Sequence, residues 1–375
     1  MTATPAPQTA PTDLARRYAS VRAQTLALAE PLSEADCQVQ SMPDTSPAKW
    51  HLAHVTWFFE TFVLERFEPG FQPFHPGFRV LFNSYYQGVG EQFSRPHRGL
   101  LTRPDLATVW RWREQVDARM AHLIEHTDST DALRLIELGL HHEQQHQELL
   151  LTDAKHLLSI NPLRPAYQRH WPLVSVAQVA PSWVEQPGGL VEVGHAGEGF
   201  AFDNECQAHL VELSAFEIDA AAVTWAQYLP FLQATGHALP PHVRCEQGAW
   251  QVQSLGQWQA LDPQAPAVHL SAQDAQAWCQ WAGRRLPTEA EWECAAQQSG
   301  FAWGQVWEWT ASQFLPYPGF EVHPYRDYSA PWWQGHRVLR GACAATSEHV
   351  VDVRYRNFFV PERRDIFAGF RSVAL

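Results

Sequence analysis

Residues 135–153 read LIELGLHHEQQHQELLLTD, and this stretch decides the fold of the first part of the chain. On a helix with about 100° of rotation per residue, His142 and His146 lie about 40° apart, and Gln145 completes an arc of about 100°. Apolar residues fall on the same stripe, namely Leu135, Leu138 and Leu149. The pattern therefore predicts a helix whose histidine face points into a bundle of helices.

Two imidazoles at positions i and i+4 on an inward face can chelate one transition-metal ion. A second predicted helix, over residues 47–67, offers a third nitrogen ligand from His51 or His54. Three neutral imidazoles leave open positions on a divalent ion, which suits iron that binds substrates and O₂, and suits zinc equally well. The alternative is that these are core histidines without a ligand. Residue spacing does not choose between the metals.

Helical stretches alternate with short breaks in residues 1–165. Ser46, followed by proline at the first helical position, predicts one start with Ser46 as the N-cap. A long irregular segment over residues 71–99 follows that helix. The four predicted helices cover residues 13–29, 47–67, 104–126 and 131–160. They predict a four-helix bundle with one long crossover, in which His141 and Glu143 lie on the flanks of the last helix.

Residues 166–375 have a different sequence pattern from the helical first part of the chain. Residues 166–186 are rich in proline and tryptophan and predict a connection between two domains. Residues 187–375 consist of short β-type runs separated by glycine, proline and asparagine. Only two helical patterns interrupt them, around residues 224–235 and 271–281. The chain is therefore predicted to be an α+β protein of two domains.

Composition narrows the classes of partner. The 375 residues are 45% apolar and carry a net charge of −13, which favours a sizeable core and disfavours nucleic acid as a partner. No apolar run approaches about 20 residues, so no membrane partner is expected. The six cysteines form no CxxC pair, and the first dozen residues show no signal peptide. We therefore expect a cytoplasmic location.

Further motifs resemble a known family. The first part of the chain resembles the DinB-type bundle of the ergothioneine sulfoxide synthases and selenoneine synthases in the segments WHLAHVTWFFE (50–60), FNSYY (82–86), RPHRG (95–99) and HHEQQHQELLLTD (141–153). The second part resembles their second domain in RLPTEAEWE (285–293), VWEWTAS (306–312), VLRGACAAT (338–346) and RNFFVPERRDIFAGFR (356–371). The resemblance implies a DinB-like four-helix bundle followed by a C-type-lectin-like domain of the formylglycine-generating-enzyme kind.

The same resemblance implies a chemistry and a set of metal ligands. The related enzymes use non-haem iron to join sulfur or selenium to C2 of the imidazole of hercynine, which is trimethylhistidine. The positions that match their Fe(II) ligands are His54, His142 and His146. Gln145 matches a hercynine contact. His51 is expected to support the ligands or to be structural, and Glu148 is expected to orient a ligand.

The second domain supplies the matching substrate residues. Tyr325 matches a tyrosine that donates a proton or hydrogen atom near the metal, and Tyr328 matches a hercynine contact. A phenol suits the first task because it can release a proton and an electron together. Asn357 and Phe358 match residues that face the carboxylate and the trimethylammonium group of hercynine. A quaternary ammonium has no N–H to donate, so aromatic faces are its natural surroundings.

The donor side departs from part of the family. Arg95 and Arg98 match arginines that bind the carboxylates of γ-glutamylcysteine in some relatives, and Tyr85 and Tyr86 belong to an Asn-Ser-Tyr-Tyr motif found in cysteine-using relatives. Relatives that use γ-glutamylcysteine carry an aspartate where this chain has Phe359. The absence of this aspartate removes the carboxylate that would pair with the donor's amino group. A neutral aromatic pocket would suit a selenosugar.

These matches predict an O₂-dependent Fe(II) enzyme, a selenoneine synthase that acts on hercynine and a selenosugar. The alternative is an ergothioneine-type synthase that uses cysteine or γ-glutamylcysteine as the thiol donor. A DinB-type metal-dependent thiol transferase would not need the second domain. A formylglycine-generating enzyme would need a reactive cysteine pair, which is not evident, and a lectin-like binding module would leave the histidine face without a role.

Overall fold

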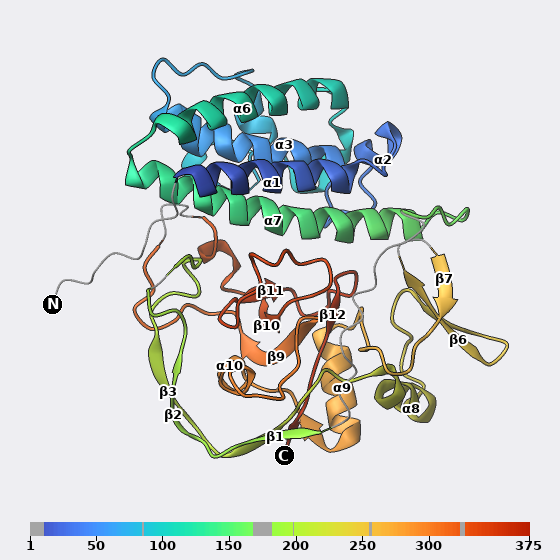
Figure 1. Cartoon of the computed structure of the whole chain (residues 1–375). Helices are drawn as coiled ribbons and strands as arrows, with labels where there is room; N and C mark the ends of the chain where they lie inside the picture. The colour runs from blue at the N-terminus through green and yellow to red at the C-terminus, as the bar shows by residue number, and fades with distance from the viewer. Residues whose placement is uncertain (1–10, 85, 168–181, 198, 255–256, 323–326) are drawn as a thin grey trace. The chain divides into compact units, whose positions relative to one another are not determined.

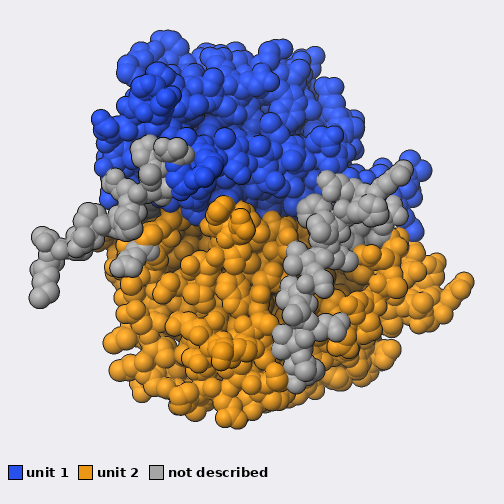
Figure 2. Space-filling model, in the orientation of Figure 1, with its two compact units in different colours: residues 1–168 blue, residues 169–375 orange. Residues whose placement is uncertain are grey.

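The structure is a computed structural model that describes residues 11–84, 86–167, 182–197, 199–254, 257–322 and 327–375. The chain divides into two compact units, Met1–Gln168 and Arg169–Leu375, which Figure 2 shows in two colours. Each unit contains its own set of buried apolar side chains.

The described part of unit 1 contains four long helices that lie side by side (Figure 1). They are α1 (Pro11–Ala29), α3 (Ala48–Phe58), α6 (Leu106–His126) and α7 (Thr130–Ser159). Helices α1 and α3 each pack against both α6 and α7, so the four surround one core. Shorter elements occupy the connections: α2 (Glu34–Gln38), α5 (Phe78–Leu81), η2 (Gln87–Val89) and η3 (Arg95–Leu100). The predicted four-helix bundle is confirmed.

The start of α3 differs from the prediction. Pro47 occupies the N-cap position, so the prediction that Ser46 caps this helix is wrong. Ser46 lies one residue too early, and its backbone N–H donates to the Asp153 carboxylate at 2.7 Å. Its hydroxyl accepts a hydrogen bond from Arg98 at 2.9 Å. Tertiary contacts, and not a local side-chain cap, therefore hold this end of the helix.

Helix α3 continues into a π-helix, η1 (Phe59–Leu64), and a last turn, α4 (Glu65–Phe67). The second predicted helix is therefore one helical segment with a widened middle. Gly139 of α7 faces the junction. A Cβ atom at Gly139 would lie 2.6 Å from a ring atom of Phe59 and 2.8 Å from one of Phe58. The two helical segments thus approach each other too closely for a side chain at this position.

Unit 2 mixes short strands with three α-helices and a short 3₁₀ helix, η4 (Ala330–Trp332), in its described residues. The helices are α8 (Trp225–Thr235), α9 (Ala272–Ala282) and α10 (Glu289–Ala296). The strands are β1 (Trp183–Gln186), β2 (Gly189–Val193), β3 (His209–Leu213), β4 (Phe216–Asp219), β5 (Val243–Glu246), β6 (Ala249–Ser254), β7 (Gln257–Ala260), β8 (Arg284–Arg285), β9 (Trp307–Gln313), β10 (Arg337–Gly341), β11 (Asn357–Phe359), β12 (Ala368–Gly369) and β13 (Val373–Ala374). They form sheets in the orders β1-β4-β13-β8, β11-β10-β9-β12, β2-β3 and β5-β6-β7.

Helix α10 corrects the prediction of only two helices in this part of the chain. Thr288 and Glu291 form a capping box, in which each side chain accepts the backbone N–H of the other residue. The Thr-x-x-Glu spacing that produces it is visible in the segment RLPTEAEWE. The helix packs against β9 and β10 and buries Trp292. The indole N–H of Trp292 donates to Glu308 at 2.7 Å, which satisfies its polar atom inside the core.

A buried ion pair supports the edge strand β11. Arg340 of β10 and Glu293 of α10 are both almost fully buried and form an ion pair. Arg340 also donates to the backbone carbonyl oxygens of Arg354 at 2.8 Å and Tyr355 at 3.2 Å. These two residues lead directly into β11. The guanidinium group therefore holds the segment that carries Asn357 to the edge of its sheet.

All six cysteines are free thiols, and three of them are buried. Cys343 follows β10, and its backbone N–H donates to the Thr346 hydroxyl at 2.9 Å. Within the described residues, no helix has both the length and the apolarity that crossing a membrane requires.

We expect Gly139→Ala to lower the free energy of unfolding by about 1–3 kcal/mol, because its methyl group must displace two phenyl rings in a filled core. Helix propensity alone would favour alanine by about 1 kcal/mol. Urea unfolding of the full chain, followed by circular dichroism, measures the change. Adding Phe59→Leu should recover part of the loss by removing the nearest ring atoms. A neutral or stabilising Gly139→Ala would contradict the close approach.

Candidate metal centre

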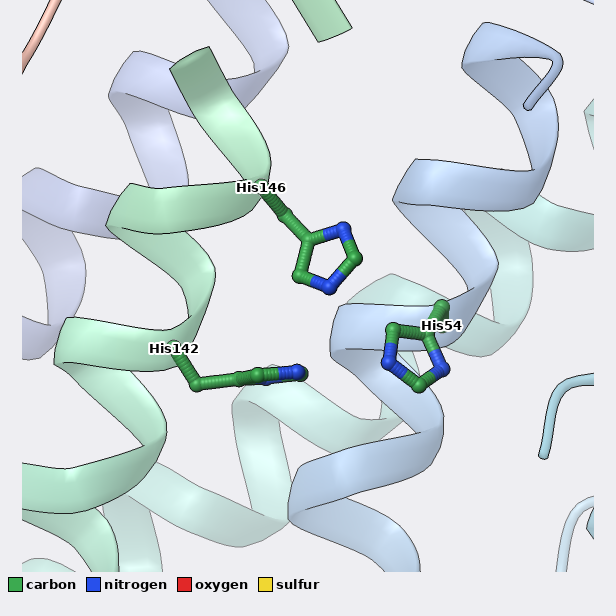
Figure 3. Close-up of side chains that lie close together, drawn as sticks. All are labelled: His54, His142 and His146. Carbon is green, nitrogen blue, oxygen red and sulfur yellow. The ribbon is translucent and has the colours of Figure 1, made fainter. Parts of the chain in front are cut away.

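Three histidines from two helices converge in unit 1, with their rings pointing into the space between α3 and α7 (Figure 3). His54 lies on α3, and His142 and His146 lie one turn apart on α7. One ring nitrogen from each lies within 4.8 Å of the other two. The ring centroids are 4.6 to 5.0 Å apart. Among the described residues, this is the only group of three His, Cys, Asp or Glu side chains close enough to hold a metal ion.

The ring of His54 is held in one orientation. It is stacked between the rings of Trp50 and Trp57, with centroid distances of 4.5 and 5.2 Å. Its Nδ1 donates to the Phe82 carbonyl oxygen at 2.7 Å, so the lone pair is on Nε2. Nε2 is buried and has no hydrogen-bond partner in the described structure. A metal ion would satisfy this buried lone pair.

The two histidines of α7 are also constrained. Nδ1 of His146 lies 2.9 Å from Nδ1 of His51, which leaves the Nε2 of His146 for the shared space. The ring of His142 packs against Phe58, with the centroids 4.8 Å apart. Packing and hydrogen bonding therefore limit the freedom of both rings before any ion binds.

Burial lowers the pKa of all three histidines. It lowers the pKa of His142 to about 3. For His54 and His146, burial is again the main cause, and the neighbouring His142 lowers the pKa further. The three imidazoles are therefore neutral at pH 7 and offer lone pairs without first losing a proton. Three neutral nitrogen donors fit a divalent transition metal and leave coordination positions for substrates.

Glu143 follows His142 in the sequence and is fully buried, although the helical pattern placed it on a flank. Its carboxylate accepts hydrogen bonds from Arg22 at 2.8 Å, Arg113 at 2.6 Å and the Thr25 hydroxyl at 2.6 Å. Burial alone would raise the pKa of Glu143, but the two guanidinium groups outweigh it and the pKa falls to about 2. The charge network ties α7 to α1 and α6 next to the metal-binding turn.

Two of the predicted donor residues lie beside the histidines. Arg98 is buried, with its guanidinium 3.4 Å from the ring centroid of Trp50, the ring that stacks on His54. It also donates to the Ser84 hydroxyl at 3.0 Å. Tyr86 is buried, and its ring is nearly parallel to that of His54 at a centroid distance of 6.3 Å. A cation and a phenol therefore border the histidine cluster.

The other predicted residues of unit 1 have different surroundings. Arg95 is exposed and donates to the Asp44 carbonyl oxygen, so it is not one of the buried groups around the histidines. Gln145 and Glu148 are half-buried on α7, as is Leu149 of the predicted apolar stripe. Two predicted residues lie outside the described part of the chain: Tyr85 and Tyr325.

Unit 2 gathers its predicted substrate residues around β11. The ring of Phe358 stacks on Phe314 with a centroid distance of 4.1 Å. Tyr328 is buried, and its ring meets that of Phe358 edge-on at 6.4 Å. Asn357 and Phe359 flank Phe358 on the strand and are half-buried. Phe358 and Tyr328 thus share an aromatic group, and the side chains of Asn357 and Phe359 leave the strand on its other face.

Sequence reasoning missed three residues around the histidines: two contact His54, and the third, Asp153, contacts His51. Trp50 and Trp57 lie four residues before and three after His54, so helical periodicity places all three rings on one face. Asp153 lies seven residues after His146, two turns along the same face of α7. These spacings were a usable signal. No sequence signal pointed to the Phe82 carbonyl oxygen, because every residue has a backbone carbonyl group whatever its side chain.

Two family models match the chain. Residues 17–150 match the DinB superfamily, and residues 173–305 match the sulfatase-modifying factor enzyme 1-like domain. The matches confirm the predicted fold class, a DinB domain followed by a C-type-lectin-like domain.

Curated relatives align with nearly the whole chain. Hercynine oxygenase of Mycolicibacterium thermoresistibile is 31% identical, and the alignment covers 96% of this chain and 94% of that protein. Hercynine oxygenase of Mycobacterium tuberculosis is 29% identical, with 97% and 99% covered. A formylglycine-generating enzyme of Streptomyces coelicolor is 34% identical but covers only 40% of this chain and 55% of its own length. Of these three alignments, the two with hercynine oxygenases extend over both units.

We expect the affinity of the protein for Zn(II) to change by less than about threefold between pH 7.5 and 6.0. The lowered pKa values of His54, His142 and His146 mean that all three are already deprotonated in this range. Three imidazoles with the ordinary pKa of about 6.5 would lose roughly 50-fold, because protons would compete with the metal. Equilibrium dialysis at both pH values measures the change. A loss near the larger figure would contradict the neutral triad.

We expect Glu143→Gln to lower the free energy of unfolding at pH 7 by about 3–5 kcal/mol, because it leaves Arg22 and Arg113 without their buried counter-charge. The lowered pKa makes this contribution present above pH 4.5 and lost as the pH falls toward about 2. The difference between wild type and variant in urea unfolding should shrink over that interval. Asp117→Asn, at a partly exposed partner of Arg22, should cost less. Equal costs would count against the buried network.

Proposed function

The chain is an enzyme of the hercynine oxygenase family, and we propose that it joins sulfur to C2 of the hercynine imidazole, with O₂ as the oxidant. The sulfur donor is a small thiol, cysteine or γ-glutamylcysteine. The curated relatives support this ergothioneine-type reaction more than the selenoneine synthase that the sequence first favoured. Six free cysteines support a reducing, cytoplasmic location for it.

The observation that carries the proposal is the group of three neutral imidazoles between α3 and α7, of which His54 and His142 are buried and His146 is half-buried. We propose Fe(II) as the ion that His54, His142 and His146 hold. Iron bound by these residues would supply the one-electron and O₂ chemistry that the new bond at C2 requires. Three histidine ligands would leave further coordination positions for the hercynine imidazole and the donor.

Residues of unit 2 would bind and protonate the substrate. The aromatic faces of Tyr328 and Phe358 suit the trimethylammonium group, which has no N–H to donate. The Asn357 amide can donate to the carboxylate of hercynine. By resemblance, Tyr325 would supply a proton or hydrogen atom, and Gln145 would contact hercynine from α7. A phenol is neutral at pH 7 and therefore holds that proton until the reaction needs it.

Arg98 would bind a carboxylate of the thiol donor. Its guanidinium is buried against Trp50, where a low dielectric strengthens a charge-assisted hydrogen bond. The ring of Tyr86 is 6.3 Å from that of His54, and its phenol would also contact the donor. The resemblance assigns Arg95 and Tyr85 to the donor as well.

A selenosugar donor is the second candidate, and Phe359 is the observation that favours it. Relatives that use γ-glutamylcysteine carry an aspartate at the position of Phe359. In this chain the Phe359 ring lies 5.4 Å from the guanidinium of Arg363. An aromatic ring can stack on a sugar but has no negative charge with which to form an ion pair with the amino group of a thiol donor. With this donor, the new bond at C2 of hercynine would be to selenium.

The donor is tested with the full chain, loaded with Fe(II) without oxygen and then offered hercynine and one donor at a time in air. The three donors are cysteine, γ-glutamylcysteine and a selenosugar. We expect mass spectrometry to find hercynine joined to the sulfur of a thiol, with consumption of O₂. His142→Ala should lose iron and product together. His156→Ala removes an imidazole of the same helix that bonds to Ser41, and it should keep both.

Product from the selenosugar alone would replace the thiol proposal by the second candidate. Absence of product with every donor from iron-loaded wild type would overturn both. Normal turnover by iron-free His142→Ala protein would overturn the metal assignment and leave only the family membership.

A further inference from the structure

A buried imidazole and a buried carboxylate extend behind His146, beyond the three ligand positions. We propose that His51 and Asp153 form a relay that fixes the tautomer of His146 and strengthens its bond to a metal ion. The inference rests on the proposed metal centre and assigns two positioning residues to it. It does not depend on which donor the enzyme uses.

Two contacts join the three side chains in a row. Oδ2 of Asp153 lies 2.9 Å from Nε2 of His51, and Nδ1 of His51 lies 2.9 Å from Nδ1 of His146. His51 is 3% exposed and Asp153 is 8% exposed, so water competes little with either contact. The backbone N–H of Ser46 also donates to Asp153 Oδ2 at 2.7 Å. The carboxylate is therefore held from two sides.

The carboxylate determines the position of each proton in the row. An ionised carboxylate only accepts hydrogen bonds, so Nε2 of His51 carries its proton and donates it to Asp153. With one N–H on the His51 imidazole, the proposed relay makes Nδ1 of His51 the acceptor and Nδ1 of His146 the donor. The lone pair of His146 is then on Nε2. The relay therefore selects the one tautomer of His146 that can ligate through Nε2.

The relay also places negative charge behind His146. A hydrogen bond from a ligating histidine to a carboxylate-linked partner increases the electron density on the ring and its basicity toward a metal. His54 has a different support, since its Nδ1 donates to the neutral carbonyl group of Phe82. His146 should therefore be the more basic of these two ligands.

A purely structural link between the helices would show the same contacts, because His51 belongs to α3 and Asp153 to α7. Such a link would change stability when it is broken, but it would leave the electronic properties of the metal site unaltered. Metal affinity and the absorption spectrum of a bound ion therefore separate the two roles.

Three variants of the full chain divide the relay into its parts. His51→Ala removes the acceptor for the His146 proton. His51→Asn keeps an amide oxygen near the position of Nδ1 but loses the link to Asp153. Asp153→Asn keeps an acceptor for both donors and removes only the charge. We expect the dissociation constant for Co(II) to rise by about 10- to 100-fold in His51→Ala, and by a smaller factor in the other two.

Equilibrium dialysis measures the Co(II) affinity, and the visible d–d bands of the bound ion report the field of the three ligands. We expect the bands to shift in Asp153→Asn and to remain as in wild type in His156→Ala. Affinity and bands like those of wild type in all three relay variants would overturn the relay. Failure of the wild-type protein itself to bind Co(II) would instead overturn the metal centre and the proposed function.

Discussion

The metal centre depends on three imidazoles that stay neutral and oriented inside a helical bundle. Burial keeps them neutral, because a charged imidazolium would lose its hydration there. Orientation has to come from the nitrogen that does not face the shared space. For His54 that nitrogen donates to a backbone carbonyl group, and for His146 it meets another buried imidazole. A bundle that only excluded water would make the rings neutral without aiming their lone pairs.

Helix α7 contains two buried carboxylates close to its metal-binding turn, and the two have different partners. Glu143 is neutralised by two arginines from the helices α1 and α6, which makes it part of the scaffold. Asp153 is joined to His51 and to the backbone at the start of α3. A buried charge without a partner would cost several kcal/mol, so each carboxylate requires its own partners on other helices. This explains how such a polar helix can lie inside a bundle.

How far the sequence predicts this structure depends on the range of the interactions involved. The four long helices and the shared face of His142 and His146 follow from helical periodicity, which is local. Helix α10 was missed although its capping box is local too. The π-helix η1, the false cap at Ser46 and the burial of Glu143 depend on partners far away in the sequence. A helical pattern predicts the direction in which a side chain points, but it does not identify the residues of other helices that the side chain contacts.

The irregular segment after α4 shows why a long connection without regular structure is useful here. The Phe82 carbonyl group that holds His54 lies at the C-terminal end of α5, where helical carbonyl groups have no partner within the helix. The buried amide of Asn83 then donates to the carbonyl oxygens of Tyr86, Gly90 and Glu91 and so shapes the following turn. Arg98 comes later, from η3. The carbonyl group that orients His54 and the candidate donor-binding residue Arg98 therefore come from separate parts of this segment. A substitution near Arg98 can change donor specificity while the hydrogen bond between His54 and Phe82 stays intact.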